Sequence, residues 1–236
     1  MARDTIYTDA IHAEGFSFDD TVVQVFADMI QRSVPGYGQT LQMVELLAHQ
    51  YAQPDTNLYD LGCSLGAATM ALDRGSHGRN CQIYAIDNAP AMIERCREQL
   101  NGEHIHLACE DILDTAIDNA SVVVLNFVLQ FVPLAARQPL LQKIYNRLNP
   151  GGALIISEKI RFDDAATDAL QTTLHEAFKR AQGYSEMEIS RKRSALENVL
   201  IPESEAIHHA RLRAAGFATP VTWFQCFNFI SMVAVK

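Results

Sequence analysis

Apolar residues along the chain gather in short uninterrupted runs rather than in alternation with polar ones. Such runs are expected of parallel strands that are covered by helices on both faces. The predicted strands are Asn57–Leu61, Gln82–Ile86, Ile105–Cys109, Ser121–Asn126 and Ala153–Ser157. The predicted helices between them are Ala67–Asp73, Ala89–Leu100 with Asn88 as its N-cap, and Pro139–Leu148, which ends at Asn149-Pro150-Gly151-Gly152. The alternation predicts an α/β fold with a doubly wound, mostly parallel sheet.

Two regions fall outside this rhythm. Residues 1–56 predict a mostly helical lead-in, and residues 163–215 predict a helical insertion. Two further strands follow, Val221–Phe227 and Phe229–Val235, and the tight connection at Asn228 predicts an antiparallel hairpin at the sheet edge. We therefore expect one domain, residues 1–236, with seven strands. The lead-in and the insertion are the candidates for a lid over the carboxyl ends of the strands.

Composition excludes several classes of protein. Hydrophobic residues make up 48% and charged residues 20%, as in ordinary globular proteins, and no apolar run is long enough to span a bilayer. The N-terminal residues carry no apolar segment of a signal peptide. Five cysteines without a Cys-x-x-Cys pair predict reduced thiols in a cytoplasmic protein and argue against a metal site. The net charge of −9 argues against a protein that grips nucleic-acid phosphates.

Candidate chemistry begins where the first predicted strand ends, in Asp60-Leu61-Gly62-Cys63-Ser64-Leu65-Gly66. Gly62 allows a tight turn and a close approach of the backbone to a ligand, and Gly66 allows the next helix to begin close to the sheet. Asp60 is suited to accept hydrogen bonds from turn amides or, through water, from an ammonium group. In an open α/β sheet, ligands bind at this edge.

Polar residues also follow the next three strands. Asp87 is placed to hold the two ribose hydroxyls of an adenosine. Asp111 beside Ile112 suits adenine, whose amine donates a hydrogen bond while its ring needs an apolar face. Asn126 ends the fourth strand and faces the same cleft. Each acid alone is equally well explained as a turn or helix cap, so the prediction depends on the ordered set.

Two other functions match parts of the turn. Gly62-Cys63-Ser64-Leu65-Gly66 matches the Gly-x-Ser-x-Gly elbow of hydrolases, with His208 or His209 as a base. However, no His-Gly-Gly loop precedes it, and Asp87 and Asp111 would have no role. Nicotinamide binding is disfavoured because Ser64 interrupts Gly-x-Gly-x-x-Gly.

The turn resembles motif I of class I S-adenosylmethionine-dependent methyltransferases, which implies their Rossmann-like fold. Segments along nearly the whole chain resemble, more specifically, the carboxy-S-adenosyl-L-methionine synthase family. These segments are Asp28–Tyr37, Tyr59–Ser64, Ala85–Cys96, Leu125–Phe127, Phe178–Glu186, Lys192–Asn198 and Trp223–Phe229. Because they include the lead-in and the insertion, which methyltransferases in general do not share, the resemblance is specific.

The resemblance implies a reaction. The family converts S-adenosyl-L-methionine and prephenate to carboxy-S-adenosyl-L-methionine and phenylpyruvate, through a sulfonium ylide that captures CO2. The product supplies the carboxymethyl group of 5-oxyacetyl uridine at the tRNA wobble position, and a separate tRNA carboxymethyltransferase performs that step. The resemblance also implies a homodimer, no direct nucleic-acid contact, no membrane and no metal. No residue stands out as the base that removes the methyl proton.

The resemblance implies ligand contacts as well. The matching positions are Tyr37, Gly62, Cys63, Ser64, Asp87, Asn88, Asp111, Ile112, Asn126 and Arg193. Composition alone interprets Arg191-Lys192-Arg193 as a solvated helix face. By resemblance, Arg193 binds the carboxylate of the carboxylated product, a task for which a guanidinium fork suits better than an amine. An ordinary small-molecule methyltransferase and a non-catalytic cofactor-binding subunit are the alternatives.

Overall fold

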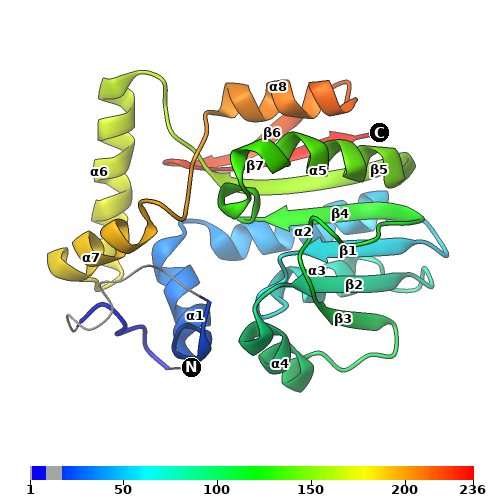
Figure 1. The fold of residues 1–236 in the computed structure, drawn as a ribbon, viewed down its shortest axis with the longest axis horizontal. Helices are drawn as coiled ribbons and strands as arrows, with labels where there is room; N and C mark the ends of the chain where they lie inside the picture. The colour runs from blue at the N-terminus through cyan, green and yellow to red at the C-terminus, as the bar shows by residue number, and fades with distance from the viewer. Residues whose placement is uncertain (1, 9–17) are drawn as a thin grey trace.

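A seven-stranded sheet forms the centre of the computed structural model, which describes residues 2–8 and 18–236. The strands are β1 (Asn57–Leu61), β2 (Gln82–Asp87), β3 (Ile105–Cys109), β4 (Ala120–Asn126), β5 (Leu148–Lys159), β6 (Val221–Cys226) and β7 (Phe229–Val235). Their order is β3-β2-β1-β4-β5-β7-β6, in which β1 to β5 pair in parallel and β7 runs antiparallel to β5 and β6 (Figure 1). The predicted doubly wound sheet with its edge hairpin is confirmed. The chain order reverses between β1 and β4, and this switch point is where α/β folds bind ligands.

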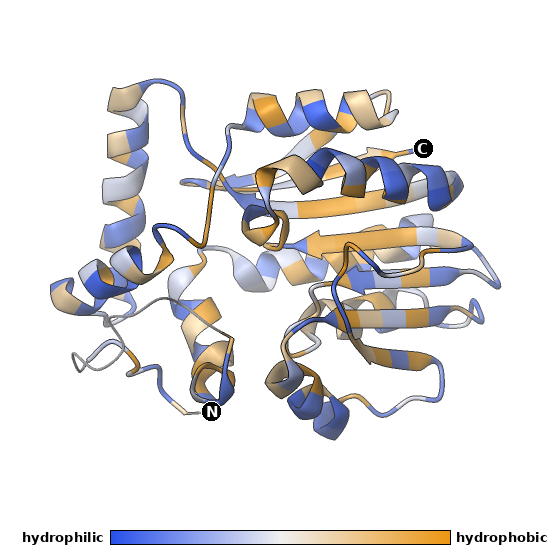
Figure 2. Ribbon diagram, in the orientation of Figure 1, coloured by the Kyte–Doolittle hydropathy of each residue, from blue (hydrophilic) through white to orange (hydrophobic). Residues whose placement is uncertain are grey.

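The central strands are apolar without interruption because both of their faces are covered. In β4, Val122 and Val124 pack with α2 (Tyr37–Tyr51) and α3 (Ala67–Gly75), whereas Val123 and Leu125 belong to the core on the opposite face. That second core includes α5 (Leu134–Arg147) and α8 (Glu205–Ala215), while α4 (Pro90–Gln99) packs beside β2 and β3. Figure 2 shows the apolar residues concentrated in the strands. The sequence pattern thus follows directly from the layered packing.

The lead-in and the insertion contribute helices that stand beside the sheet. They are α1 (Asp20–Ser33), α6 (Ala165–Ala181) and α7 (Glu186–Leu196). α1 contacts α6, and α6 contacts α7, so that segments far apart in sequence form one wall next to the carboxyl ends of the strands (Figure 1). A short 3-10 helix, η2 (Leu129–Phe131), follows β4.

Two local predictions were wrong. α5 begins at Leu134 rather than at Pro139, and Pro139 lies inside it, because burial of Leu140, Leu141 and Ile144 outweighs the one hydrogen bond that proline cannot donate. The fifth strand also begins earlier than predicted: β5 starts at Leu148, which pairs with Ala120, rather than at Ala153.

The N-cap of α4 also differs from the prediction. The N-cap position is Ala89, which provides no side-chain hydrogen bond, and Asn88 precedes it. Instead, Asp87 Oδ1 accepts a hydrogen bond from the Ala89 amide at 2.9 Å. One carboxylate at the end of β2 therefore serves both the helix start and the site described below.

Candidate functional site

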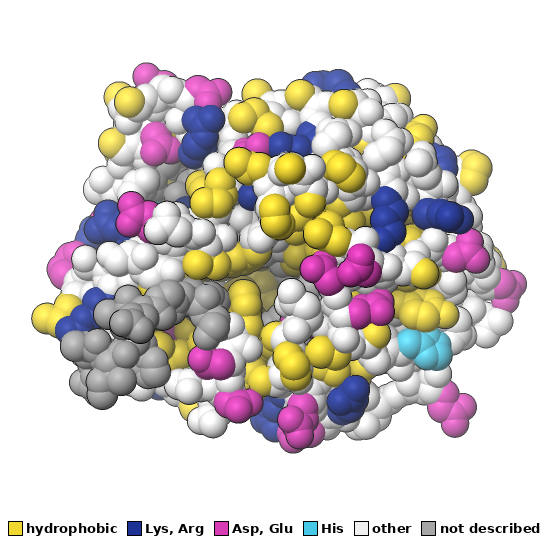
Figure 3. Space-filling view, viewed as in Figure 1, with side chains coloured by type: hydrophobic (Ala, Val, Ile, Leu, Met, Phe, Trp, Pro, Cys, Tyr) yellow, Lys and Arg dark blue, Asp and Glu magenta, His cyan; other side chains and the backbone are white. Residues whose placement is uncertain are grey.

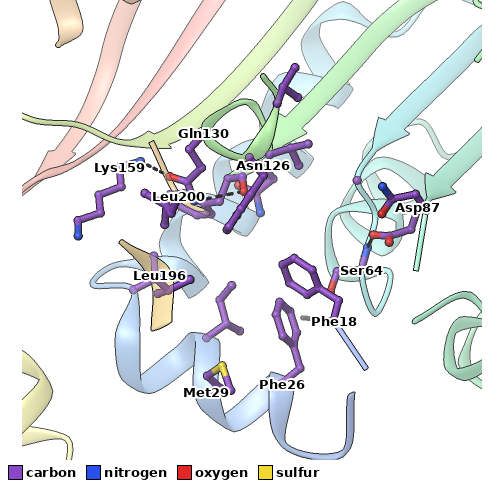
Figure 4. Close-up of a pocket in the computed structure, with 18 of the residues that line it drawn as sticks. Phe18, Phe26, Met29, Ser64, Asp87, Asn126, Gln130, Lys159, Leu196 and Leu200 are labelled. Carbon is purple, nitrogen blue, oxygen red and sulfur yellow. Dashed lines mark hydrogen bonds between the residues drawn. The ribbon is translucent and has the colours of Figure 1, made fainter. Parts of the chain in front are cut away.

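A cavity of about 350 Å³ opens at the carboxyl ends of the strands, between the sheet and the helices α1, α6 and α7. Figure 3 shows apolar side chains around a hollow near the centre of this face, and Figure 4 shows side chains of the cavity wall. Its strand-end wall includes Gly62, Ser64, Asp87, Asn88, Asp111, Ile112 and Asn126. The cavity thus lies at the switch point where the fold is expected to bind a ligand.

The turn after β1 is held in place by the end of β2. The amides of Gly62 and Cys63 both donate to the carbonyl oxygen of Ile86 at 2.8 Å, and the Ser64 amide donates to Asp87 Oδ2 at 2.8 Å. Gly62 has a φ of +87°, and a Cβ there would lie 2.4 Å from Val128 Cγ2. Only glycine fits this position, because any side chain meets both backbone strain and a steric clash.

Asp87 is the polar centre of this region. Its two carboxylate oxygens accept hydrogen bonds from the amides of Ser64 and Ala89, and burial raises its pKa. Each carboxylate oxygen has two lone pairs, so further acceptor capacity remains for ribose hydroxyls at the cavity wall. The carboxylate can therefore shape the turn and contact a ligand at the same time.

Two buried oxygens near this edge have no hydrogen-bond partner within the described part of the chain: Asp60 Oδ1 and Asn126 Oδ1. Asp60 Oδ2 accepts from Thr69 Oγ1 at 2.6 Å, and burial raises the pKa of Asp60 to about 6. An unpaired buried acceptor is unfavourable, so a ligand that donates hydrogen bonds would satisfy Asn126, which lines the cavity. Asp60 is fully buried and lines neither cavity, so it acts on a ligand only through its charge. The ammonium and sulfonium groups of S-adenosylmethionine fit this requirement.

The structure brings seven of the ten predicted contact residues together around the cavity. They are the strand-end residues Gly62, Ser64, Asp87, Asn88, Asp111, Ile112 and Asn126. Tyr37 and Cys63 line a neighbouring cavity of about 440 Å³, and Ser64 lines both cavities. Burial raises the pKa of Tyr37, whose phenol thus stays neutral. All ten assignments remain predictions about a ligand.

Arg193 lies in neither cavity wall. Its side chain is 62% exposed, and Nη1 lies 3.1 Å from Glu176 Oε1. Within a single chain, Arg193 is therefore part of a solvated helix face, as the composition of the run Arg191-Lys192-Arg193 predicts. That prediction does not describe Lys192, which is buried in the same run.

The hydrolase interpretation finds no support in the arrangement around Ser64. The Ser64 hydroxyl donates to Met92 Sδ at 3.5 Å, whereas His209 Nε2 lies 2.9 Å from Thr222 Oγ1. Both candidate histidines are on α8, which packs against α5. No catalytic triad forms with Ser64 in the described residues.

Sequence reasoning did not assign the basic side chains at the other end of the cavity: Lys159, His175, Lys179 and Lys192. Burial, reinforced by neighbouring cations, lowers the pKa of Lys179 to about 7 and that of His175 to about 3. A signal was available for Lys159, which follows the predicted fifth strand by two residues. No local sequence signal places Lys179 or Lys192 at the cavity, because only the folding of the insertion brings them there.

Comparisons with known proteins identify the fold and the family. Residues 58–152 match a family model described as a methyltransferase domain. The chain is 17% identical to human N-acetylserotonin methyltransferase in complex with SAM (TM-score 0.64) and 16% identical to an O-methyltransferase family protein from Burkholderia thailandensis (TM-score 0.63). It covers 55% and 59% of those longer chains, with 92% of its own length aligned in both. These structural similarities confirm the Rossmann-like methyltransferase fold.

No helix within the described residues has the length and apolar character to cross a membrane.

Two curated relatives match over full length. The chain is 53% identical to a carboxy-S-adenosyl-L-methionine synthase of Shewanella sp. (strain ANA-3), with 100% of the chain and 99% of the relative covered. It is 54% identical to a protein of the same name from Shigella boydii serotype 4 (strain Sb227), with 99% and 97% covered. The chain is therefore an enzyme of the carboxy-S-adenosyl-L-methionine synthase family.

Proposed function

We propose that this enzyme converts S-adenosyl-L-methionine and prephenate to carboxy-S-adenosyl-L-methionine and phenylpyruvate. The full-length match to named carboxy-S-adenosyl-L-methionine synthases supports the proposal most strongly, because it includes the lead-in and the insertion. The cavity supports it independently, since its two ends differ in chemistry. One end presents Asp87, Asp111 and the unpaired oxygen of Asn126, and the other presents amines.

The reaction balances as a carboxyl transfer. Prephenate loses CO2 and its hydroxyl group as its ring becomes aromatic, and the methyl group of S-adenosylmethionine loses a proton and gains the carboxyl group. The proton and the hydroxyl group leave as water. Aromatisation provides the driving force, and the apolar wall formed by Phe18, Phe26 and Met29 limits the access of water to the reacting carbon.

Individual residues have separate tasks in this proposal. Asp87 and Asn88 hold the ribose, Asp111 and Ile112 contact adenine, and Gly62 to Ser64 let the backbone approach the ligand. Asp60, buried below the turn, favours the ammonium group through its charge rather than by contact. Tyr37 and Arg193 complete the site for the carboxylated product. No metal takes part in the proposal, and the base for the methyl proton has no assigned residue.

The wider role follows the family. We propose a cytoplasmic homodimer whose product serves a separate tRNA carboxymethyltransferase in making 5-oxyacetyl uridine at the wobble position. The acidic composition suits an enzyme that passes on a small molecule rather than binding tRNA itself.

Mass spectrometry tests the proposal directly. The purified enzyme is incubated with S-adenosylmethionine and prephenate, and the small molecules are released by denaturation. We expect a nucleoside heavier than S-adenosylmethionine by one CO2, together with phenylpyruvate, and no product without prephenate. Recovery of only unmodified S-adenosylmethionine from the wild-type enzyme would refute the proposal. Release of S-adenosylhomocysteine would instead favour an ordinary methyltransferase.

A further inference from the structure

Three lysines from three separate elements meet at the end of the cavity that lies away from Asp87. Lys159 ends β5, Lys179 belongs to the last turn of α6, and Lys192 belongs to α7. Figure 4 shows Lys159 on one side of the cavity, with Asp87 and Ser64 on the opposite side. The nucleoside end and the lysine end are therefore distinct regions of one cavity.

Two of these amines have no partner in the part of the chain that the structure describes. Neither the Lys159 nor the Lys179 amine has a hydrogen bond or ion pair with any residue in the ranges 2–8 and 18–236. Lys192 is different, since its Nζ donates to Ser33 Oγ at 2.8 Å and lies 3.8 Å from Asp4 Oδ2. The first two amines thus keep their full donor capacity for a ligand.

The acids nearest to these amines are already engaged. Asp168 Oδ1 accepts from the Phe162 amide at 2.8 Å, and Glu176 Oε1 pairs with Arg193 at 3.1 Å. Both acids act on Lys159 only from beyond ion-pair distance. Apart from the pair of Lys192 with Asp4, the positive charge at this end is therefore not neutralised by the residues that the structure describes.

Such a cluster is unfavourable unless a ligand compensates it. Burial lowers the pKa of Lys159, and it lowers those of Lys179 and Lys192 to about 7 and about 8. Repulsion from Lys192 and Lys159 adds to the shift of Lys179. Partly buried cations without partners destabilise a fold, and a bound anion removes that penalty. The sulfonium and ammonium groups of S-adenosylmethionine are cations, so the lysines repel that part of the first substrate.

The cavity that the amines line also has apolar walls. Phe131, Leu196, Leu200 and Phe229 line the same cavity. A ligand that satisfies both features carries carboxylates on a compact hydrocarbon ring. Inorganic phosphate would leave the apolar wall uncovered.

We propose that Lys159 and Lys179 form the subsite that binds the carboxylates of the second substrate, a small dicarboxylate on an unsaturated ring, with Lys192 adding to the positive field. This inference rests on the proposed function and adds the residues that select the carboxyl donor. The lysines bind the carboxylates of the carboxyl donor at the end of the cavity opposite Asp87. The middle of the cavity is then the place where the two substrates meet.

The test uses the full-length enzyme with Lys159→Met and Lys179→Met. Arg180→Met is the matched control, because Arg180 is the neighbour of Lys179 on α6 and its exposed side chain pairs with Glu186 at 3.0 Å. Calorimetry measures the Kd of prephenate and of S-adenosylmethionine separately, and steady-state kinetics measures KM and kcat. For each lysine variant we expect the Kd and KM of prephenate to rise about tenfold or more, with the Kd of S-adenosylmethionine unchanged. Lysine-to-arginine variants should recover most of the prephenate affinity.

The outcomes separate the two proposals. An unchanged Kd and KM for prephenate in both methionine variants overturns the subsite while the reaction stands. A weaker Kd for S-adenosylmethionine instead assigns the amines to its methionine carboxylate and also overturns the subsite. Prephenate that binds through the lysines without product formation by the wild-type enzyme retains the subsite and refutes the reaction. Thermal unfolding of each variant verifies that the protein is folded. Lysine-to-glutamine variants replace any methionine variant that does not fold.

Discussion

At the scale of single residues, Asp87 is positioned for two tasks. Its oxygens accept hydrogen bonds from the amides of Ser64 and Ala89, and it lines the cavity where we expect a ribose to bind. A charged acceptor of this kind contributes about 1.5–3 kcal/mol per hydrogen bond, and an asparagine amide accepts through only one of its two polar atoms.

Asp87→Asn should therefore weaken S-adenosylmethionine binding by about tenfold or more. The reason is that the amide nitrogen of asparagine cannot accept, so a donor that one of the carboxylate oxygens serves, a backbone amide or a ribose hydroxyl, loses its acceptor. Isothermal titration calorimetry gives the Kd, and Asp73→Asn is the control, because Asp73 is an exposed acid that pairs with His104 outside the cavity. Equal affinities of the Asp87 variant and the wild type would show that the carboxylate only shapes the turn.

Gly62 allows a sharper comparison, because Gly78 shares its backbone conformation. Both have a positive φ, +87° and +77°, but a Cβ at Gly78 meets nothing within 4 Å. Gly62→Ala should lower the free energy of unfolding by clearly more than the about 1 kcal/mol expected of Gly78→Ala, because the steric clash with Val128 adds to the backbone strain. Urea denaturation of both variants measures the difference, and equal losses would mean that Val128 moves aside freely.

At the scale of elements, the chain shows why strands were easier to predict than helix limits. Strand β4 is apolar on both faces, so its run of valines is visible without knowledge of the fold. Helix α5 is tolerated with Pro139 inside it only because Leu140, Leu141 and Ile144 are buried against the sheet. Such tertiary compensation leaves no local sequence signal, so the start of this helix was predicted five residues late.

One ionic cluster joins elements that are distant in sequence. Glu203 lies between Arg137 of α5 and Arg211 of α8, and the Arg137 side chain is fully buried. Glu203 Oε1 lies 2.7 Å from Arg211 Nη2, and Oε2 lies 2.5 Å from Arg137 Nη1. Although burial raises the pKa of Glu203, hydrogen bonds and charges from both arginines outweigh it and lower the pKa. The native state therefore binds the Glu203 proton less readily than the unfolded chain does.

Glu203→Gln should lower the free energy of unfolding at pH 7 by about 3 kcal/mol, because it leaves the buried Arg137 charge without compensation. A lowered folded-state pKa means that this contribution is complete above the ordinary glutamate pKa and is lost as the pH falls through the folded value. The difference between variant and wild type in urea denaturation should thus shrink on acidification. Glu98→Gln is the control, since Glu98 pairs with Arg95 on the surface. A difference independent of pH would refute this role of the carboxylate.

At the scale of the whole molecule, the predictable half of the candidate site is the half that the sheet builds. Carboxyl ends of parallel strands meet at one edge, so Asp87, Asp111 and Asn126 were assigned to one cleft from sequence order alone. Lys179 and Lys192 reach the cavity only because α6 and α7 fold back beside α1. Such placement depends on long-range packing, which a single sequence does not reveal.

Arg193 has no place in the cavity wall of its own chain, yet the family resemblance assigns it to a carboxylate. Its side chain is mostly exposed on α7, where Met187 is 58% exposed, and the neighbouring α6 exposes Leu170 at 57%. Exposed apolar side chains on adjacent helices are typical of a surface that binds another protein. We therefore expect Arg193 to serve the site of the second copy in the proposed homodimer.

Mixing two inactive variants tests this arrangement. Arg193→Ala and Asp87→Ala should each abolish formation of the carboxylated product, the first by removing the carboxylate contact and the second by disrupting the nucleoside end. In a mixed dimer, the Arg193→Ala chain keeps an intact nucleoside end and receives arginine from its partner, so one of the two sites is complete. Random mixing of equal amounts should then restore about a quarter of the wild-type activity, because half of the dimers are mixed and each mixed dimer has one working site out of two.

Co-expression with two different affinity tags isolates the mixed species, and light scattering verifies that it is a dimer. Product formation that remains absent in this species would place Arg193 at the site of its own chain, with a side-chain movement away from Glu176 as the required step.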